Sequence, residues 1–365
     1  MSLVYLDWNA TTPPLEAVVD VMAETARQAW GNPASVHGRG RAARDVVETA
    51  REEIALLVGA SARDVIFTSG GTEANNLALH RAPALVTSQL EHPSVTLVAE
   101  ALEADGRPVV WLPVPASGRL APEAVAEALA GLPPGAVVAV AAANHETGVI
   151  QPLAAIAEAA LRAGARLHVD AVQAVGKLPA AALAGADTVS LAAHKIRGPK
   201  GIGALVHRPE RAPKPLLLGG SQERGRRPGT VDPVAAAGFR VAASWARSSL
   251  AERPRLAALR DRFEAELVGR GALVNGGEAP RLEHVSNVSF LGRAGDELVA
   301  ALDLLGVALS SGSACSAGTT EASKIITAML GVERARAALR ISLGDATTDG
   351  DVQSALVAFE RVLRA

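Results

Sequence analysis

The sequence predicts an α/β protein that has a large domain built on a mostly parallel β-sheet and a smaller α+β domain. Between residues 65 and 207, short apolar segments alternate with helical segments, which is typical of a parallel sheet with helices on both faces. After about residue 232, long helices with few strands indicate the second domain. The predicted strands of the sheet are Val65–Thr68, Ala84–Ser88, Val109–Pro113, Val137–Ala141, Leu167–Asp170, Thr188–Ala192 and Ala204–His207.

The two domains are expected to divide the chain unevenly. The large domain spans residues 15–250, and the small domain spans residues 251–365 and is completed by an extended N-terminal arm at residues 1–14. Hydrophobic periodicity, with glycine and proline as breakers, sets the bounds of the other elements. Helices are predicted at Leu15–Ala29, Arg39–Val58, Pro233–Ser248, Leu256–Arg270, Gly295–Leu305 and Asp349–Leu363, and strands at Val285–Phe290 and Leu339–Leu343.

The composition argues against several classes of function. A net charge of -2 over 365 residues gives no attraction to nucleic acid or to an anionic membrane, and 3% aromatic residues leave no stacking platform for single strands. Segment Met1–Pro13 does not resemble a secretory signal, and no stretch approaches the length of a membrane span. We therefore expect a cytoplasmic enzyme with no direct nucleic-acid binding. The single cysteine, Cys315, excludes an intramolecular disulfide and is either inert or functionally singular.

Lys195 is the first candidate catalytic residue of the sequence. It follows His194 and lies between a predicted buried strand and the glycine-rich turn Gly198–Gly203. A lysine on a rigid turn at the end of a core strand is partly desolvated, and desolvation lowers the pKa of an amine toward the range useful for Schiff-base chemistry. The alternative is a surface lysine in a tight turn.

Asp170 strengthens the catalytic interpretation of Lys195. It ends a predicted strand 25 positions before Lys195, and Gln173 follows one helical turn later. A carboxylate in this position keeps the pyridine nitrogen of pyridoxal phosphate protonated, so that the ring accepts the electrons of a substrate carbanion. By itself Asp170 is more simply a helix N-cap. The pair of strand-end residues favours the cofactor.

A phosphate site is predicted at Ser69–Glu73, where a strand is followed by two glycines and Thr72 at the start of a helix. Backbone N–H groups converge in such a turn, and the helix dipole favours a dianion. The same pattern is also common in turns without a ligand.

At these stretches the sequence resembles the cysteine desulfurases, which are pyridoxal-phosphate enzymes of the class V aminotransferase group. The resemblance covers nearly the whole chain and implies a fold type I enzyme with a seven-stranded sheet in the large domain. The matching stretches, in the family's order, are Leu6–Pro13, Gly31–Ser35 with His37, Phe67–Asn75, Glu91–His92, His168–Gln173, His194–Lys195, Glu223–Arg224, Gly229–Thr230, Ser310–Cys315 and Arg340–Gly344.

The resemblance also implies roles for site residues. His92, which from the residues alone would be a helix cap or a core histidine, stacks on the cofactor ring and assists proton transfer. His145 stands in place of the second asparagine of the family's pair, and Ala192 stands in place of a phosphate-binding serine. The implied cofactor contacts are Gly71, Thr72, His145, Asp170, Gln173, His194 and, from the partner subunit of a homodimer, Thr230. The implied substrate contacts are Arg340, as a clamp for the α-carboxylate, and Asn32.

Cys315 decides between the activities on this scaffold. It lies among small polar residues, the reverse of the apolar setting of a structural cysteine. The resemblance implies that Lys195 removes the Cα proton of L-cysteine, that the Cys315 thiolate takes the sulfur as a persulfide, and that a sulfur-acceptor protein receives it while alanine leaves. The alternatives are a selenocysteine lyase, a class V aminotransferase, and a non-catalytic subunit of a sulfur-transfer complex. Lys195 argues against the last of these, because a silent subunit needs no Schiff base.

Overall fold

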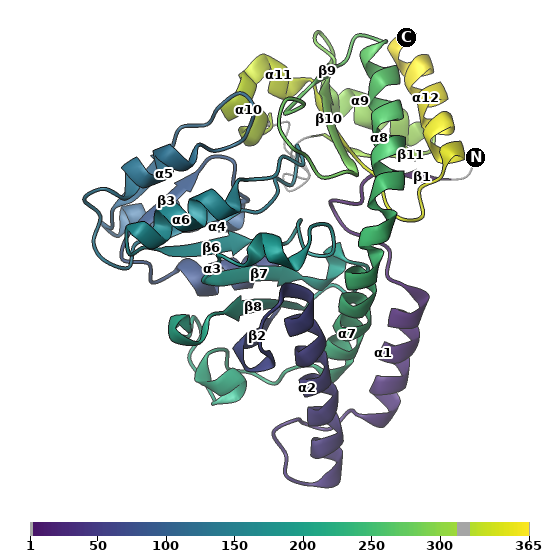
Figure 1. Cartoon of the computed structure of the whole chain (residues 1–365). Coiled ribbons are helices and arrows are strands. Elements are labelled where there is room, and N and C mark those ends of the chain that lie inside the picture. The colour runs from purple at the N-terminus through teal and green to yellow at the C-terminus, as the bar shows by residue number, and fades with distance from the viewer. Residues whose placement is uncertain (1–2, 312–321, 365) are drawn as a thin grey trace.

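The computed structural model describes residues 3–311 and 322–364, and it confirms the predicted α/β architecture. Within these residues the largest sheet has seven strands in the order β2-β8-β7-β6-β5-β3-β4 (Figure 1). Its strands are β2 (Val65–Thr68), β3 (Leu85–Ser88), β4 (Val109–Leu112), β5 (Val137–Ala141), β6 (Arg166–Asp170), β7 (Thr188–Ala192) and β8 (Gly203–His207).

The direction of the strands explains where a site can form. Strand β8 is antiparallel to both of its neighbours, β2 and β7, whereas the pairs from β7 through β6 and β5 to β3 and β4 are parallel. The carboxyl ends of β3, β5, β6 and β7 therefore lie along one edge of the sheet. In open α/β sheets this edge is the usual position of a ligand site.

Alternate residues of one strand serve two different cores, as the two-residue period of a strand requires. Val138 and Val140 of β5 pack in a core with helices α2, α6 and α7, whereas Val137 and Ala139 pack on the opposite face with α4. All five residues of β5 are buried, which explains why it has the continuous apolar sequence of a strand covered on both faces. The helices are α1 (Glu16–Gln28), α2 (Gly38–Val58), α3 (Gly71–Leu79), α4 (Pro93–Ala104), α5 (Pro122–Leu129), α6 (Leu153–Arg162), α7 (Pro233–Ser248), α8 (Arg253–Val268), α9 (Gly295–Leu304), α10 (Lys324–Leu330), α11 (Val332–Arg336) and α12 (Asp349–Arg364).

A second group of strands lies beyond α7, which continues through the 3-10 turn Ser249–Glu252 into α8 (Figure 1). Among the described residues, β12-β13-β10-β9 form an antiparallel sheet, and β1 pairs in parallel with β11. The N-terminal arm places Val4 and Leu6 in the same core as Phe263 and Phe359. The predicted domain division at residues 14 and 250 stays a prediction, and this packing supports it. The strands are β1 (Val4–Tyr5), β9 (Leu273–Val274), β10 (Val285–Ser289), β11 (Val307–Ala308), β12 (Ser310–Ser311) and β13 (Ala338–Ser342).

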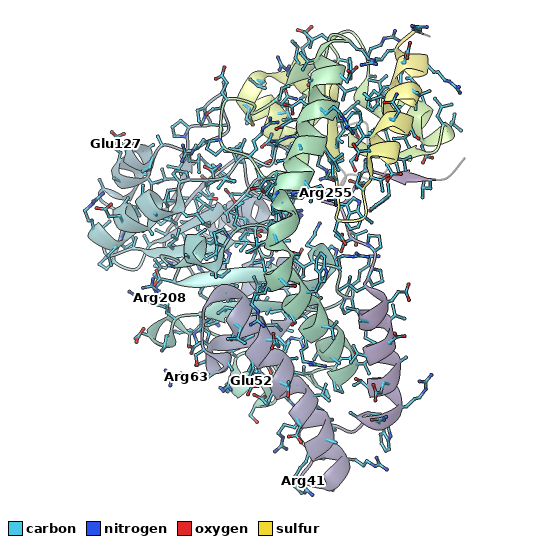
Figure 2. All side chains as sticks on the ribbon, turned by 45° about the vertical axis from the view of Figure 1, so that its right-hand side comes forward. Arg41, Glu52, Arg63, Glu127, Arg208 and Arg255 are labelled. Atoms are coloured by element: carbon cyan, nitrogen blue, oxygen red, sulfur yellow. The ribbon has the colours of Figure 1, made fainter. Side chains whose placement is uncertain are left out.

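Charged side chains are spread over many elements of the surface. Figure 2 shows exposed residues of both signs on separate parts of the chain, among them Arg41 and Glu52 on α2, Glu127 on α5, and Arg208 after β8. Arg255 of α8 donates hydrogen bonds to the carbonyl oxygens of Thr347 (2.8 Å) and Asp345 (2.7 Å) and so ties α8 to the loop before α12. In the described part of the chain, no helix combines the length and the apolar character needed to cross a membrane.

Candidate active site

A cavity of about 280 Å³ lies at the carboxyl edge of the large sheet. It gathers nine of the predicted site residues from six separate stretches of the chain. Thr230 and Asn32 are exposed, and neither lines this cavity within the single chain, so their roles stay predictions. Cys315 lies outside the described residues. The predicted residues that line the cavity are Gly71, Thr72, His92, His145, Asp170, Gln173, His194, Lys195 and Arg340.

Lys195 is half-buried at the end of a 3-10 turn, Ala193–Lys195, that directly follows β7. Its Nζ donates hydrogen bonds to the carbonyl oxygens of Asn9 (2.5 Å) and Ala10 (2.8 Å), which belong to the N-terminal arm. Both acceptors are backbone carbonyl groups, so these two contacts hold the amine in the cavity through the arm itself. The lysine is anchored in the site, as predicted, rather than exposed in a turn.

Asp170 is buried at the end of β6, where it forms a local cap and also lines the cavity. Its Oδ1 accepts a hydrogen bond from the backbone N–H of Val172 (3.0 Å), which is a local cap. Its Oδ2 accepts from Nδ2 of Asn75 (2.7 Å), and the carboxylate still lines the cavity. The Oδ1 of Asn75 contacts Nε2 of His168 at 3.0 Å, and burial lowers the pKa of His168 to about 4, so this ring is neutral and donates. Asn75 therefore orients the carboxylate from behind.

His92 is likewise both a cap and a cavity residue. Its Nδ1 accepts a hydrogen bond from the backbone N–H of Ser94 (3.1 Å) at the start of α4, and it lies 2.8 Å from the Ser94 hydroxyl. That hydroxyl accepts from Nδ2 of Asn75 (2.8 Å), which directs its own proton to the ring. Burial lowers the pKa of His92, with Lys195 acting in the same direction and Asp170 against it. Because Nδ1 accepts the Ser94 N–H, the neutral form of this ring carries its proton on Nε2.

Arg340 and His145 form the wall contributed by β13 and by the loop after β5. The buried guanidinium of Arg340 donates to Asp7 Oδ1 (2.7 Å), and its Nε has no hydrogen-bond partner among the described residues. The His145 ring contacts the His92 ring edge-on, with 5.4 Å between centroids, and burial holds the pKa of His145 well below its usual range. The preceding Asn144 instead uses its Oδ1 to accept from the backbone N–H groups of Glu146 and Thr147, each at 2.9 Å. Of this pair, only the second position lines the cavity.

The comparisons with known proteins now identify the family. The family described as aminotransferase class-V matches residues 4–355. The chain belongs to this family. An IscS-like cysteine desulfurase of Mycobacterium tuberculosis is 40% identical over 374 residues, covering 97% of this chain and 94% of that protein. Among solved structures, a NifS-like protein matches with a TM-score of 0.90 at 32% identity over 99% of each chain. SspA in complex with cysteine matches with a TM-score of 0.78 at 30% identity, over 93% of this chain and 98% of that one.

Membership of the class V family implies pyridoxal phosphate, and the described residues fit this group. At the start of α3, a Cβ on Gly71 would lie 2.7 Å from Cγ2 of Val172, so only glycine leaves room for a close approach to the backbone. Thr72 and His194 line the same cavity as Gly71. Burial lowers the pKa of His194 to about 4, which leaves a neutral imidazole with one donor for a phosphate oxygen. Asp170 lines the same cavity, and its oxygens, each of which accepts one described hydrogen bond, have lone pairs left for a protonated ring nitrogen.

Four polar residues of the site were missed by the sequence analysis: Asn9, Asn75, Ser94 and Lys177. Asn9 and Asn75 belong to stretches that carried the resemblance, and their buried positions within those stretches were the available signal. Asn9 is fully buried, and its Oδ1 accepts from His284 Nε2 at 3.0 Å. No sequence pattern predicts such contacts, because they join segments far apart in the chain.

We expect Asn75→Ala to lower the free energy of unfolding by about 2–4 kcal/mol, because it removes the Asn75 partner of Asp170 Oδ2 and of His168 Nε2 and one of the two side-chain contacts of the Ser94 hydroxyl. Urea denaturation measures this loss. Asn76→Ala is the matched control, since Asn76 donates only to the carbonyl oxygen of Thr72 at the helix surface, and it should cost less than about 1 kcal/mol. Equal losses from both variants would contradict the central role of Asn75.

Glu146 predicts a pH dependence of stability. Burial raises the pKa of this carboxyl from 4.5 to about 7, against the opposing effects of Ser323 and Arg340. Since the folded state keeps the proton longer than the unfolded state, the stabilisation is complete below pH 4.5 and is lost as the pH rises to about 7, by about 3 kcal/mol. We expect Glu146→Gln to remove this slope from urea denaturation measured between pH 5 and 8. The exposed Glu127→Gln is the control and should keep it.

Proposed function

We propose that the protein is a pyridoxal 5'-phosphate-dependent cysteine desulfurase that converts L-cysteine to L-alanine and passes the sulfur through a persulfide on Cys315. The observation that carries the proposal is the convergence of Lys195, Asp170, His92 and Arg340 on one cavity, in a chain 40% identical to a cysteine desulfurase. These side chains are the set needed to hold the cofactor and an amino-acid substrate together.

Each of these residues has a distinct task. Lys195 holds the cofactor covalently and, once released, takes the Cα proton of the substrate at Nζ. The bound cofactor supplies the electron sink for this step, and Asp170 keeps the ring nitrogen protonated. Arg340 binds the substrate carboxylate, and its Nε, which has no hydrogen-bond partner among the described residues, is the N–H left to donate. Cys315 attacks the substrate sulfur as a thiolate, so that the carbon–sulfur bond breaks and a sulfur–sulfur bond forms.

The experiment that tests this function is a balance of products. Purified protein with pyridoxal phosphate, L-cysteine and a thiol reductant should release alanine and sulfide in equal amounts. The selenocysteine lyase alternative predicts turnover of selenocysteine with little turnover of cysteine. The aminotransferase alternative predicts the formation of an oxoacid in place of alanine, and either result would overturn the proposal.

The protein is also proposed to act as a cytoplasmic homodimer that delivers sulfur to an acceptor protein, for iron–sulfur cluster assembly or for thiolation of tRNA or a cofactor. Thr230 is exposed, which is compatible with a contact to the cofactor of the partner subunit. We expect dilution below the dimer dissociation constant to release the cofactor, and Thr230→Ala to raise the cofactor dissociation constant by about threefold to tenfold. Sedimentation velocity monitored at the cofactor absorbance checks this, and a monomer with full occupancy would contradict it.

A further inference from the structure

The turn after β6 places Lys177 directly behind Gln173. Hydrogen bonds from the N–H groups of Val175 and Leu178 to the carbonyl oxygens of Ala171 and Ala174 close two turns in this segment, and Gly176 between them has a left-handed φ of 68°. The turns bring the side chains of residues 173 and 177 together. Lys177 Nζ donates a hydrogen bond of 2.8 Å to Oε1 of Gln173.

The two ends of the Gln173 amide meet partners of opposite kind. A lysine amine only donates when it is charged, so it bonds to Oε1, whereas the carbonyl oxygen of Asn9 only accepts and takes a hydrogen bond of 2.9 Å from Nε2. This arrangement fixes which end of the amide is the oxygen. Nε2 has a second N–H, which has no partner among the described residues, and Gln173 lines the cofactor cavity. That N–H is the donor left for an oxygen atom in the cavity.

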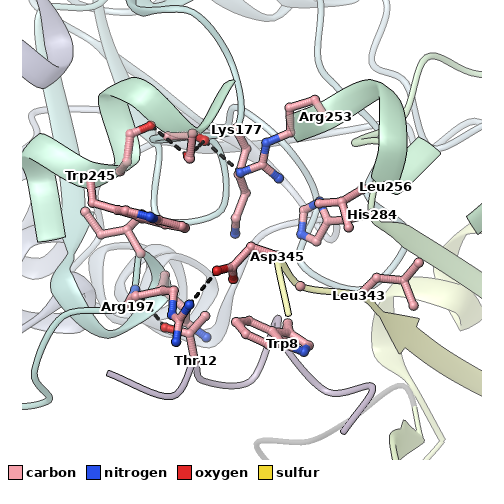
Figure 3. A pocket seen from close by; sticks show the side chains of 16 residues that line it. Trp8, Thr12, Lys177, Arg197, Trp245, Arg253, Leu256, His284, Leu343 and Asp345 are labelled. Carbon is pink, nitrogen blue, oxygen red and sulfur yellow. Dashed lines mark hydrogen bonds and ion pairs between the residues drawn. The ribbon is translucent and has the colours of Figure 1, made fainter. Parts of the chain in front are cut away.

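Lys177 lies in an environment that is unfavourable for a charged amine. Its side chain is 6% exposed, and no described carboxylate forms an ion pair with it. Figure 3 shows its amine pointing into a second, smaller cavity of about 40 Å³, where Arg253 and His284 also lie. Burial, together with Arg253, Lys195 and Arg340, holds the pKa of Lys177 well below its usual range. A lysine that only filled space would be less stable here than an apolar side chain of the same size.

We infer that Lys177 is a positioning residue that fixes the orientation of the Gln173 amide and so presents Nε2, rather than Oε1, to the 3' oxygen of the cofactor. That oxygen is an acceptor when deprotonated, so a flipped amide would place two acceptors against each other. The inference rests on the proposed cofactor site. It requires a hydrogen-bond donor at position 177 but not a positive charge.

Binding of pyridoxal 5'-phosphate to the apoprotein, followed by absorbance, tests the inference. Lys177→Met removes the donor and keeps the length of the side chain, and it should raise the dissociation constant about threefold to tenfold and shift the absorption spectrum of the bound cofactor. Lys177→Gln keeps a neutral donor and should stay within about twofold of the unchanged protein. Arg253→Met is the matched control, because it removes a cation from the same small cavity. Arg253 donates through Nη2 to the carbonyl oxygen of Gly176 (2.7 Å) rather than to Gln173. This variant should leave the spectrum of the bound cofactor unchanged.

A double-mutant cycle separates positioning from a general effect on packing. In a Gln173→Ala background, Lys177→Met should have no further effect on cofactor binding, because the amide it orients is gone. The inference would be overturned if Lys177→Met raised the cofactor dissociation constant equally in both backgrounds. It would also be overturned if Lys177→Gln bound the cofactor as weakly as Lys177→Met. If Lys177→Met does not fold, Lys177→Leu offers a second apolar replacement in the same cycle.

The cycle also distinguishes this inference from the proposed function. A normal dissociation constant for Gln173→Ala would overturn both the predicted contact of Gln173 with the cofactor and the role of Lys177. A raised cofactor dissociation constant for Gln173→Ala, together with an unchanged one for Lys177→Met, would overturn the role of Lys177 alone. The product balance from L-cysteine tests the desulfurase activity independently of either result.

Discussion

Lys195→Ala should lose at least about 10³-fold in turnover of L-cysteine, because it removes both the covalent attachment of the cofactor and the base for the Cα proton. The structure supports this expectation, since Lys195 lines the cavity and its Nζ donates hydrogen bonds to the carbonyl oxygens of Asn9 and Ala10. Alanine production measures the loss. Treatment of the unchanged protein with borohydride should also fix the cofactor on Lys195, as peptide mapping would reveal.

The control for this variant is Lys200→Ala, which changes an exposed lysine five positions along the same turn. It should retain turnover and borohydride labelling at Lys195. Label on any other lysine, or substantial turnover by Lys195→Ala, would defeat the assignment of Lys195 as the residue that carries the cofactor.

Cys315→Ala should bind the cofactor and L-cysteine normally and yet release almost no alanine or sulfide. The steps before sulfur transfer depend on Lys195, Asp170 and Arg340, which the substitution leaves in place. Cys315 is the single cysteine of the sequence, so no other thiol of the same chain can take the sulfur. Thiol labelling after incubation with L-cysteine should detect a persulfide on the unchanged protein and none on the variant.

Ser313→Ala keeps the thiol within the same stretch and is the control for this experiment. Selenocysteine is an informative second substrate, because its weaker carbon–selenium bond permits elimination without attack by a thiol. Residual activity on selenocysteine is therefore compatible with the mechanism. Near-normal alanine production from cysteine by Cys315→Ala would instead favour a lyase that eliminates sulfur directly.

Much of the large sheet could be predicted because local pattern and burial agree there. The predicted bounds of β2, β5 and β7 are those of the structure, since continuous apolar runs between turns belong to strands buried on both faces. The short strands β1 and β11 were not predicted. Each has two residues, too few for a periodic signal, and each forms only because the other is present.

The residues of the candidate site likewise fall into those that the sequence could predict and those that it could not. Residues at strand ends, such as Asp170 and Lys195, could be found from the chain because the topology of a parallel sheet gathers strand ends at one edge. The contacts of Asn75 with Asp170 and His168 could not be found, since a hydrogen bond between distant segments leaves no trace in local sequence. The contact of Lys177 with Gln173 is local, but it crosses an irregular turn that has no periodic signal. The capping and the catalytic interpretations of His92 do not exclude each other, because one imidazole serves as cap through Nδ1 and also lines the cavity. Its catalytic role stays a prediction.

The pairing of the N-terminal arm with late parts of the chain has a consequence for biosynthesis. Leu6 donates its backbone N–H to Ala308, and Trp8 and Asn9 bond to Ser342, so these contacts of the arm form only after residue 342 has left the ribosome. The carbonyl oxygens of Asn9 and Ala10 that bind Lys195 follow directly on this part of the arm. A nascent chain can therefore complete its large sheet while the support behind these two carbonyl groups is still incomplete. We expect cofactor loading to be a late event of maturation, and truncated chains that end before residue 307 to escape it.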